Sequence, residues 1–243
     1  MKTAREILFR TVALFAVAMR ATWEFDNSDG YRSPEELQPF ADKIDTWLEK
    51  KGYYPYLTES EKTLTKSPIG VTPRKEGVVR MYDWEAVPVL LWALGLGELK
   101  DRFQDEDYIF KPAFDSLEFP DEEHDADRIL SRVKMRSEEE VEERCNLAFL
   151  WHWRAVETRL DPGWHGDIRQ VIHNTFCGVH DDCLSSFALY ESGEDVDMIF
   201  RGRPVFALTG GARGSYEVTA EMMHHALEWI LCDEDWDETP TDT

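Results

Sequence analysis

The sequence predicts a mainly α-helical fold, an irregular multi-helix bundle around a central apolar helix at about residues 74–95. Three observations lead to this prediction. Apolar residues recur at helical spacing through most of the chain. Motifs that start helices precede several of these stretches. Residues 82–95 are apolar on almost every side, which is typical of a helix buried at the centre of a fold.

The N-terminal helices have recognisable boundaries. A first helix is expected over residues 4–21, before a polar turn. Residues 33–36 (Ser-Pro-Glu-Glu) form a capping box with proline at the first helical position, and the helix that follows should stop at Gly52. Residues 58–61 (Thr-Glu-Ser-Glu) cap a further short helix.

The central helix, about 74–95, contains Pro88. Proline removes a backbone donor inside a helix, so a kink is expected near Trp84 or Glu85. Asp83 and Glu85 bring carboxylates to the start of the apolar stretch, where a buried charge needs a partner.

The C-terminal half is expected to contain three helices. A short one is predicted near residues 128–133, and a capping box at residues 137–140 (Ser-Glu-Glu-Glu) opens a helix that runs to about Leu160. The last helix should span about residues 215–232. Between them, residues 196–208 fit either a small β-hairpin or an extended arm.

Length and charge exclude several classes of protein. At 243 residues we expect a single helical domain over residues 1–243, with a candidate sub-lobe at 164–214. A net charge of -22 argues against binding to nucleic acid or to an anionic membrane. No run reaches the ~20 apolar residues of a membrane span. The four cysteines are too few and too scattered for a disulfide framework, so we expect a cytoplasmic protein.

One side of the first helix has two interpretations. Its members recur at helical spacing: Glu6, Arg10, Ala13, Val17 and Arg20. They form either a narrow solvent-facing strip with a Glu6–Arg10 pair, which the spacing favours, or a buried side whose arginines meet Glu85. A buried pair of that kind would specify packing rather than chemistry.

The helix after residue 137 holds the best pocket candidate. His152 lies on its apolar stripe, where a satisfied core histidine is favoured over a ligand or base. Aromatic residues flank it, and an arginine follows that could stack on an indole. This crowding fits core packing or the lining of a pocket. The candidate binding residues are Trp84, Glu85, Trp151, Trp153 and Arg154.

His224 and His225 lie in the last helix. His225 shares a stripe with apolar residues and should pack inside. His224 and Glu228 have the spacing of a solvated i,i+4 pair, which is favoured, or of a proton carrier beside a carboxylate. The candidate catalytic residues for an enzyme are Glu85, His152 and His224.

One spacing is typical of a metal site. His173, Cys177, His180 and Cys183 form H-x3-C-x2-H-x2-C, a donor set that suits tetrahedral zinc. On a continuous helix the fourth ligand lies further round, so Gly178 would have to break the helix. Zinc sites usually draw ligand pairs from separate elements. Ordinary interior cysteines and loop histidines are therefore favoured, and no cofactor is expected.

Several motifs together resemble the bacterial domain-of-unknown-function 4272 family. The most specific is Trp-Glu-Ala followed by Leu-Leu-Trp-Ala-Leu-Gly within residues 84–95. The others are residues 5–14, residues 135–139 with the later His152-Trp153, and residues 197–204, 224–229 and 236–241. The resemblance implies a mostly helical, cytoplasmic bacterial domain and carries no reaction with it.

Two departures from the family pattern weigh against an enzyme. This chain has Met222-Met223 where the family commonly has Glu-Arg, and Val156 before Glu157 where the family often has arginine and an acid. Both remove polar residues that would suit a shared catalytic network.

The sequence therefore favours a non-catalytic binding or scaffold protein. It would use its acidic surface to engage a protein partner, for example to neutralise a basic one. The alternative is a hydrolase-like enzyme with a pocket between the central helix and the helix of His152 and Trp153. The partner, the substrate and the oligomeric state are left open.

Overall fold

A computed structural model describes residues 1–99 and 115–241, which form two compact units. Unit 1 comprises residues 1–98, 115–137 and 229–239. Unit 2 comprises residues 138–228, with Leu99 and residues 240–241. The described chain is mainly helical with one small antiparallel sheet, which confirms the predicted fold class. The single domain stays a prediction, and the candidate sub-lobe, residues 164–214, lies within unit 2.

Six helices lie within the described part of unit 1. They are α1 (Ala4–Ser28), α2 (Pro34–Lys51), α3 (Glu59–Lys66), α4 (Arg74–Met81), α5 (Ala86–Ala93) and α7 (Ala126–Leu130), with 3-10 turns at Tyr54–Tyr56, Tyr82–Glu85 and Trp236–Glu238. Two of the three predicted capping boxes are confirmed: Ser33 and Thr58 each cap the amide three residues on, while Glu36 and Glu61 reach back to the cap amides.

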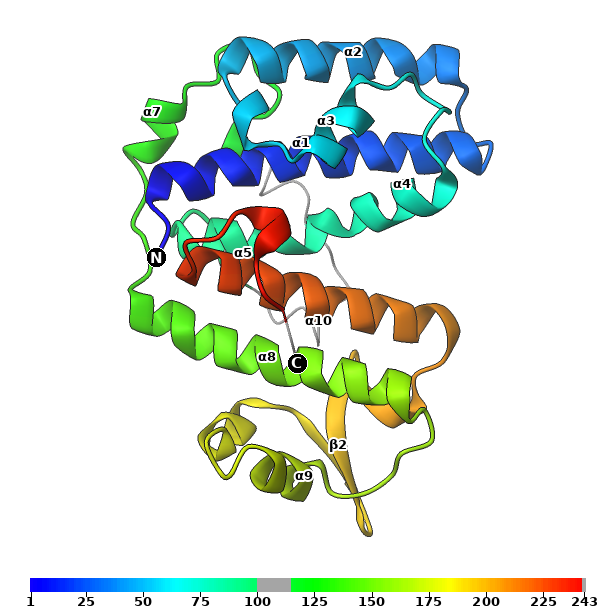
Figure 1. The fold of residues 1–243 in the computed structure, drawn as a ribbon, viewed down its shortest axis with the longest axis vertical. Helices are drawn as coiled ribbons and strands as arrows, with labels where there is room; N and C mark the ends of the chain where they lie inside the picture. The colour runs from blue at the N-terminus through cyan, green and yellow to red at the C-terminus, as the bar shows by residue number, and fades with distance from the viewer. Residues whose placement is uncertain (100–114, 242–243) are drawn as a thin grey trace. The chain divides into compact units, whose positions relative to one another are not determined.

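α1 lies at the centre of unit 1, with α2 and α3 on one side and α4 and α5 on the other (Figure 1). It continues to Ser28, past its predicted end, and α4 packs along it. Arg10 and Arg20 are 2% and 1% exposed, and Ala13 and Val17 are fully buried. The predicted solvent-facing strip is therefore wrong, because neighbouring helices cover α1 on every side.

Residues 74–95 form two helices rather than one. α4 ends at Met81, a 3-10 turn spans Tyr82–Glu85, and α5 follows it. The break falls at the predicted kink. Pro88 has no amide hydrogen to donate to the carbonyl of Trp84, so the regular helical ladder cannot pass through this point.

α5 ends against the segment that follows α7. The carbonyls of Ala93 and Leu94 accept hydrogen bonds from the amides of Arg136 and Lys134, at 2.9 and 3.0 Å. These bonds satisfy two of the carbonyls that a helix end leaves free. Gly95 continues the turn at φ +67, and a Cβ there would lie 2.2 Å from the carbonyl oxygen of Lys134.

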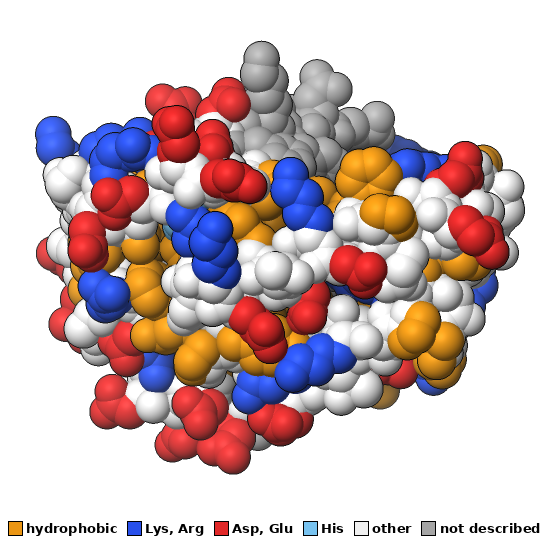
Figure 2. Space-filling view, turned by 90° about the horizontal axis from the view of Figure 1, so that it is seen from above, with side chains coloured by type: hydrophobic (Ala, Val, Ile, Leu, Met, Phe, Trp, Pro, Cys, Tyr) orange, Lys and Arg blue, Asp and Glu red, His pale blue; other side chains and the backbone are white. Residues whose placement is uncertain are grey.

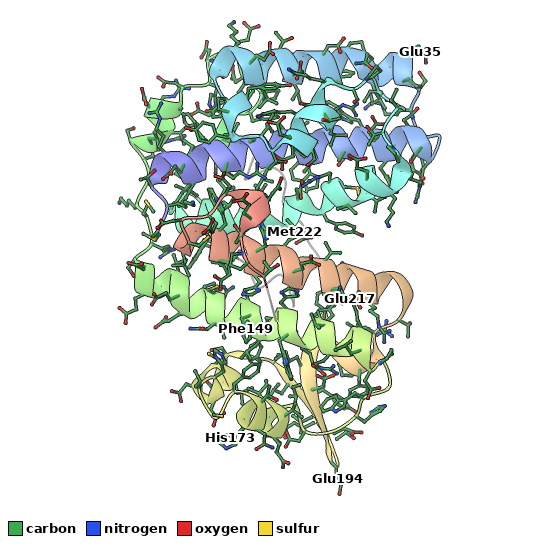
Figure 3. All side chains as sticks on the ribbon, in the orientation of Figure 1. Glu35, Phe149, His173, Glu194, Glu217 and Met222 are labelled. Carbon is green, nitrogen blue, oxygen red and sulfur yellow. The ribbon has the colours of Figure 1, made fainter. Side chains whose placement is uncertain are left out.

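Unit 2 combines helices with a small sheet. Its elements are α8 (Glu138–Leu160), α9 (Ile168–Thr175), β1 (Leu189–Ser192), β2 (Asp195–Phe200), β3 (Arg203–Pro204) and most of α10 (Gly210–Leu231), with 3-10 turns at Asp181–Ser186 and Val205–Ala207. The strands pair antiparallel in the order β1-β2-β3, with Leu189 opposite Met198. The hairpin begins before residue 196 because Gly193, at φ +66, makes its turn beside Glu194 (Figure 3).

None of the helices among the described residues is both long enough and apolar enough to cross a bilayer.

Gly95→Ala should destabilise the protein far more than Gly52→Ala. Both glycines have positive φ, which costs an alanine about 1 kcal/mol. Only at Gly95 does the new methyl group also meet backbone, so we expect a total loss of about 3 kcal/mol or more in the free energy of unfolding. Urea denaturation of the two variants checks this. Equal losses would contradict the close approach of residue 134 to the end of α5.

Candidate functional site

Two buried ion pairs hold the arginines of α1. Arg10 and Glu61 form a bidentate pair with both nitrogen–oxygen distances at 2.7 Å, and Arg10 also donates to the carbonyl of Tyr56. Arg20 pairs with Glu24 one turn further along α1, at 2.7 Å. Glu6, expected beside Arg10, instead caps its own helix through Thr3. The arginines of α1 therefore stabilise packing within unit 1.

Asp83 lies at the edge of this charged cluster. It is 3% exposed, and the guanidinium of Arg80 is 3.8 Å from both Asp83 and Glu61. Burial, and then the nearby charge of Glu61, raise the pKa of Asp83 from 3.8 to about 7. Burial alone would also raise the pKa of Glu61, but the bidentate Arg10 lowers it below its ordinary value.

Trp84 and Glu85, predicted to bind a partner, lie in the interior of unit 1. The Trp84 indole donates to the hydroxyl of Thr22 and meets Phe15 edge to face at 4.8 Å. Trp84 and Glu85 are each 9% exposed. Their place in the 3-10 turn lets them pack against α1.

A cleft of about 380 Å³ opens on unit 1 where residues 55–59 face residues 229–238, and we call it the tryptophan cleft. Its lining is Arg10, Pro55, Tyr56, Leu57, Thr58, Glu59, Trp229, Asp235, Trp236, Asp237 and Glu238. The indoles of Trp229 and Trp236 meet edge to face at 5.4 Å. Four carboxylates stand around these rings, and all four residues are exposed.

Cations of the chain itself lie over both indoles of the tryptophan cleft. The guanidinium carbon of Arg10 is 4.4 Å from the ring centre of Trp236. The ammonium of Lys2 is 5.5 Å from the ring centre of Trp229 and donates to the carbonyl of Glu234. An indole face attracts positive charge, and here each ring already has a cation within range.

In unit 2, buried Arg154 connects α8 to β2 through an ion pair. Its guanidinium forms a bidentate pair with Asp197, at 2.9 and 2.8 Å, and both residues are almost fully buried. Asp197 also accepts from the amide of Phe206. Trp151 and Trp153, also predicted to bind, are 5% and 6% exposed, and Trp153 packs edge to face on Phe176.

His152 and His224, two of the candidate catalytic residues, face each other between α8 and α10. Their Nδ1 atoms are 3.1 Å apart, and both rings are buried. The expectation that His224 is solvated is wrong, since it is 2% exposed while His225 is only partly buried. α10 therefore directs His224 toward α8. Burial, and then the neighbouring His224, lower the pKa of His152 to about 4.

Two further polar groups complete this cluster. The thiol of Cys145 donates to Glu228 at 3.3 Å, and Nε2 of His224 lies 3.4 Å from the same carboxylate oxygen. Burial, and then Glu228, raise the pKa of the Cys145 thiol well above its ordinary value. The sequence pattern places His152 on the apolar stripe of α8, but it does not indicate that Cys145 and His152 meet His224 and Glu228.

Of the four residues of the metal-like spacing, His173 lies in α9 and Cys183 in the 3-10 turn at Asp181–Ser186, while Cys177 and His180 lie between these elements. His173 pairs with Asp181 at 2.7 Å, and His180 packs against Phe149 and Phe176. Cys177 is exposed. Within the described part of the chain, the group of three metal-type donors whose atoms come within 4.8 Å of one another is Cys145, His224 and Glu228.

Sequence reasoning missed the partners of the buried arginines and the tryptophan cleft. Glu61 was recognised only as a capping residue, and Asp197 only as part of a family motif. Residues 229–232 were expected only as the end of the last helix, and residues 236–238 only as part of a family motif. The alternation of Trp236 with acids was the signal that could have indicated a cation-binding surface.

Asp83→Asn should stabilise the protein increasingly as pH rises from 4 to 7. The folded chain retains the Asp83 proton in this window while the unfolded chain loses it, so wild-type stability falls as pH rises. The raised pKa sets a ceiling of about 4 kcal/mol on this loss, which Asn avoids. Urea denaturation at pH 5 and pH 8 should show the advantage of Asn growing by about 2 kcal/mol. Exposed Asp233→Asn is the control, and equal pH profiles for all three proteins would contradict the burial of Asp83.

The comparisons with known proteins give a family and no activity. A family model described as "Domain of unknown function (DUF4272)" matches residues 1–169, which include α1 to α8. Comparison with curated proteins and with solved structures found no match. Residues 224–238, which complete both the tryptophan cleft and the His152–His224 cluster, lie outside the matched part. Because the match covers well over half of its length, the chain belongs to the DUF4272 family.

Proposed function

We propose that this chain is a non-catalytic binding protein whose unit 1 engages a lysine- or arginine-bearing segment of a protein partner at the tryptophan cleft. The single observation that carries the proposal is the composition of that cleft. Paired indoles form its wall and exposed carboxylates its rim. Aromatic faces and carboxylates are the groups that bind an alkylammonium or guanidinium ion.

The charge balance of the cleft favours a cationic occupant. Arg10, its one lining cation, is neutralised by the bidentate contact with Glu61. Of the rim carboxylates, Glu59 pairs with Lys62 at 2.7 Å. Asp235, Asp237 and Glu238 add three negative charges beside the indoles. A net charge of -22 for the whole chain would attract a basic partner from further away, which raises the rate of association.

The excess of negative charge is not equally strong on every part of the surface. On the face that Figure 2 shows, acidic and basic side chains are interspersed, with apolar groups among them. A mixed surface of this kind has no strong field of a single sign. The tryptophan cleft, by contrast, combines a hollow, two aromatic rings and a rim of four exposed carboxylates, so it is the better place for a basic segment to dock.

The hydrolase-like alternative stays a prediction. It requires Glu85 and His224 to serve one reaction, and these residues belong to unit 1 and unit 2 respectively. The proposal of a binding function needs the residues of unit 1 alone.

A short oligolysine peptide should bind the full-length protein and bind more weakly as salt is added. Raising the ionic strength from about 0.01 M to about 1 M shortens the screening length from about 30 Å to about 3 Å, so the attraction should largely vanish. Calorimetric titration checks this. Oligoglutamate and fully acetylated oligolysine of the same length should not bind. Binding that ignores salt, or no binding at low salt, would refute the proposed function.

The variant Asp235→Asn, Asp237→Asn, Glu238→Gln should weaken oligolysine binding about tenfold. Each lost exposed contact is worth about 0.5 kcal/mol, and about 1.4 kcal/mol is a factor of ten. The matched control removes three exposed carboxylates of unit 1 outside the cleft: Glu49→Gln, Glu122→Gln and Glu123→Gln. Equal weakening by the two variants would mean that total charge, and not the cleft, binds the peptide.

A further inference from the structure

Three side chains of unit 2 bring together atoms of the kind that bind metal ions. Cys145 comes from α8, and His224 and Glu228 come from successive turns of α10. Their ligand atoms all lie within 4.8 Å of one another. The Cys145 and His224 side chains are buried, while Glu228 is about one-third exposed and connects the group to solvent.

Nε2 of His224 is the unsatisfied atom of this group. It is fully buried, and its contact with the Glu228 carboxylate, at 3.4 Å, lacks the geometry of a hydrogen bond. A buried polar atom without a hydrogen bond is costly, so such an atom calls for an explanation. The thiol of Cys145 donates its hydrogen bond to Glu228 and not to His224. One cation at the centre would instead satisfy the sulfur, the nitrogen and the oxygen together.

From this convergence we propose that Cys145, His224 and Glu228 bind a zinc ion, with its fourth coordination position open on the side of Glu228. Thiolate, imidazole and carboxylate are the donors that zinc takes in proteins. Zinc bonds of about 2.0–2.3 Å place tetrahedral ligand atoms about 3.3–3.7 Å apart. The contacts of Glu228 with Cys145 and His224, 3.3 and 3.4 Å, have this spacing before any ion binds.

His152 is the group that orients the ligand His224. Its Nδ1 lies 3.1 Å from Nδ1 of His224. When Nδ1 of His224 carries the proton, it donates a hydrogen bond to the unprotonated Nδ1 of neutral His152. That tautomer leaves the lone pair of Nε2 facing Cys145 and Glu228. Zinc-bound histidines usually donate their second N–H to such an acceptor. Phe149, labelled in Figure 3, packs edge to face on the His224 ring at 5.6 Å and limits its rotation.

Binding would exchange one proton for one ion. The Cys145 thiol releases its proton to solvent as the sulfur–zinc bond forms, and no oxidation is involved. Glu228 loses the hydrogen bond of the thiol and gains a bond to zinc. The ion would also cross-link α8 to α10, so it should raise the melting temperature of the protein.

The test is calorimetric titration of the metal-free, full-length protein with zinc chloride, together with metal analysis after dialysis. We expect one zinc per chain and release of one proton. Cobalt should bind in its place and give a thiolate-to-cobalt charge-transfer band. Failure of the wild-type protein to bind zinc or cobalt would overturn the proposal.

Matched cysteine variants identify the ligand. Cys145→Ser should weaken zinc binding at least about a hundredfold and abolish the cobalt charge-transfer band, because a hydroxyl is a far poorer ligand than a thiolate. Cys177→Ser and Cys183→Ser, in the metal-like spacing of residues 173–183, should change neither. Loss of zinc in the Cys177 or Cys183 variant, with zinc retained in the Cys145 variant, would overturn the proposal.

Two further variants separate metal binding from loss of fold. Glu228 is partly exposed, so Glu228→Gln should keep the fold, as judged by circular dichroism, yet lose the zinc-dependent rise in melting temperature. His152→Phe keeps the ring volume but removes the acceptor, and should weaken zinc binding about 10–100-fold. An undiminished thermal shift in the Glu228 variant would remove Glu228 from the site and contradict the three-ligand assignment.

Discussion

The bidentate pair of Arg10 and Glu61 is the interaction on which unit 1 depends. α1 carries Arg10 into an apolar interior, where an unpaired guanidinium would be prohibitively costly. Glu61 meets it with both carboxylate oxygens and at the same time caps α3 through Thr58. The guanidinium then forms the surface on which Trp236 rests. One ion pair thus joins the first helix, the third helix and the C-terminal segment, and so positions the tryptophan cleft.

Unit 2 also has a buried, bidentate arginine–carboxylate pair that joins separate elements. Arg154 and Asp197 join α8 to the sheet, and breaking a buried pair of this type typically costs about 3–5 kcal/mol. The polar cluster on α8 and α10 is different, because its groups are not matched in the same way. Nε2 of His224 has no hydrogen bond, whereas every hydrogen of the Arg154 fork that faces Asp197 has an acceptor. The α8–α10 cluster is also distinguished by its chemistry, since a thiol, an imidazole and a carboxylate, which are all zinc ligands, converge there.

Local features could be predicted from the sequence, and long-range partners could not. Capping boxes depend on residues three apart, so the starts of α2 and α3 were predictable, and Pro88 located the break before α5. The partner of Arg10 could not be predicted, because Glu61 and Glu85 are both acids near apolar stretches. Helical periodicity also predicted that His225 packs inside and favoured a solvated His224, whereas His224 is the more buried of the two. Which of them faces inward depends on where α10 packs, and one residue of rotation, about 100°, decides it.

The most direct test of the binding function is a titration of ¹⁵N-labelled protein with oligolysine, followed through the indole N–H signals of its nine tryptophans. Tryptophan-to-phenylalanine variants assign the signals. The tryptophan cleft predicts that the signals of Trp229 and Trp236 shift progressively with peptide and saturate together. Trp229 and Trp236 are as buried as Trp84 and Trp153, but only the first two line the cleft, so the signals of Trp84 and Trp153 should stay in place. Saturable binding that leaves Trp229 and Trp236 unchanged would contradict the account.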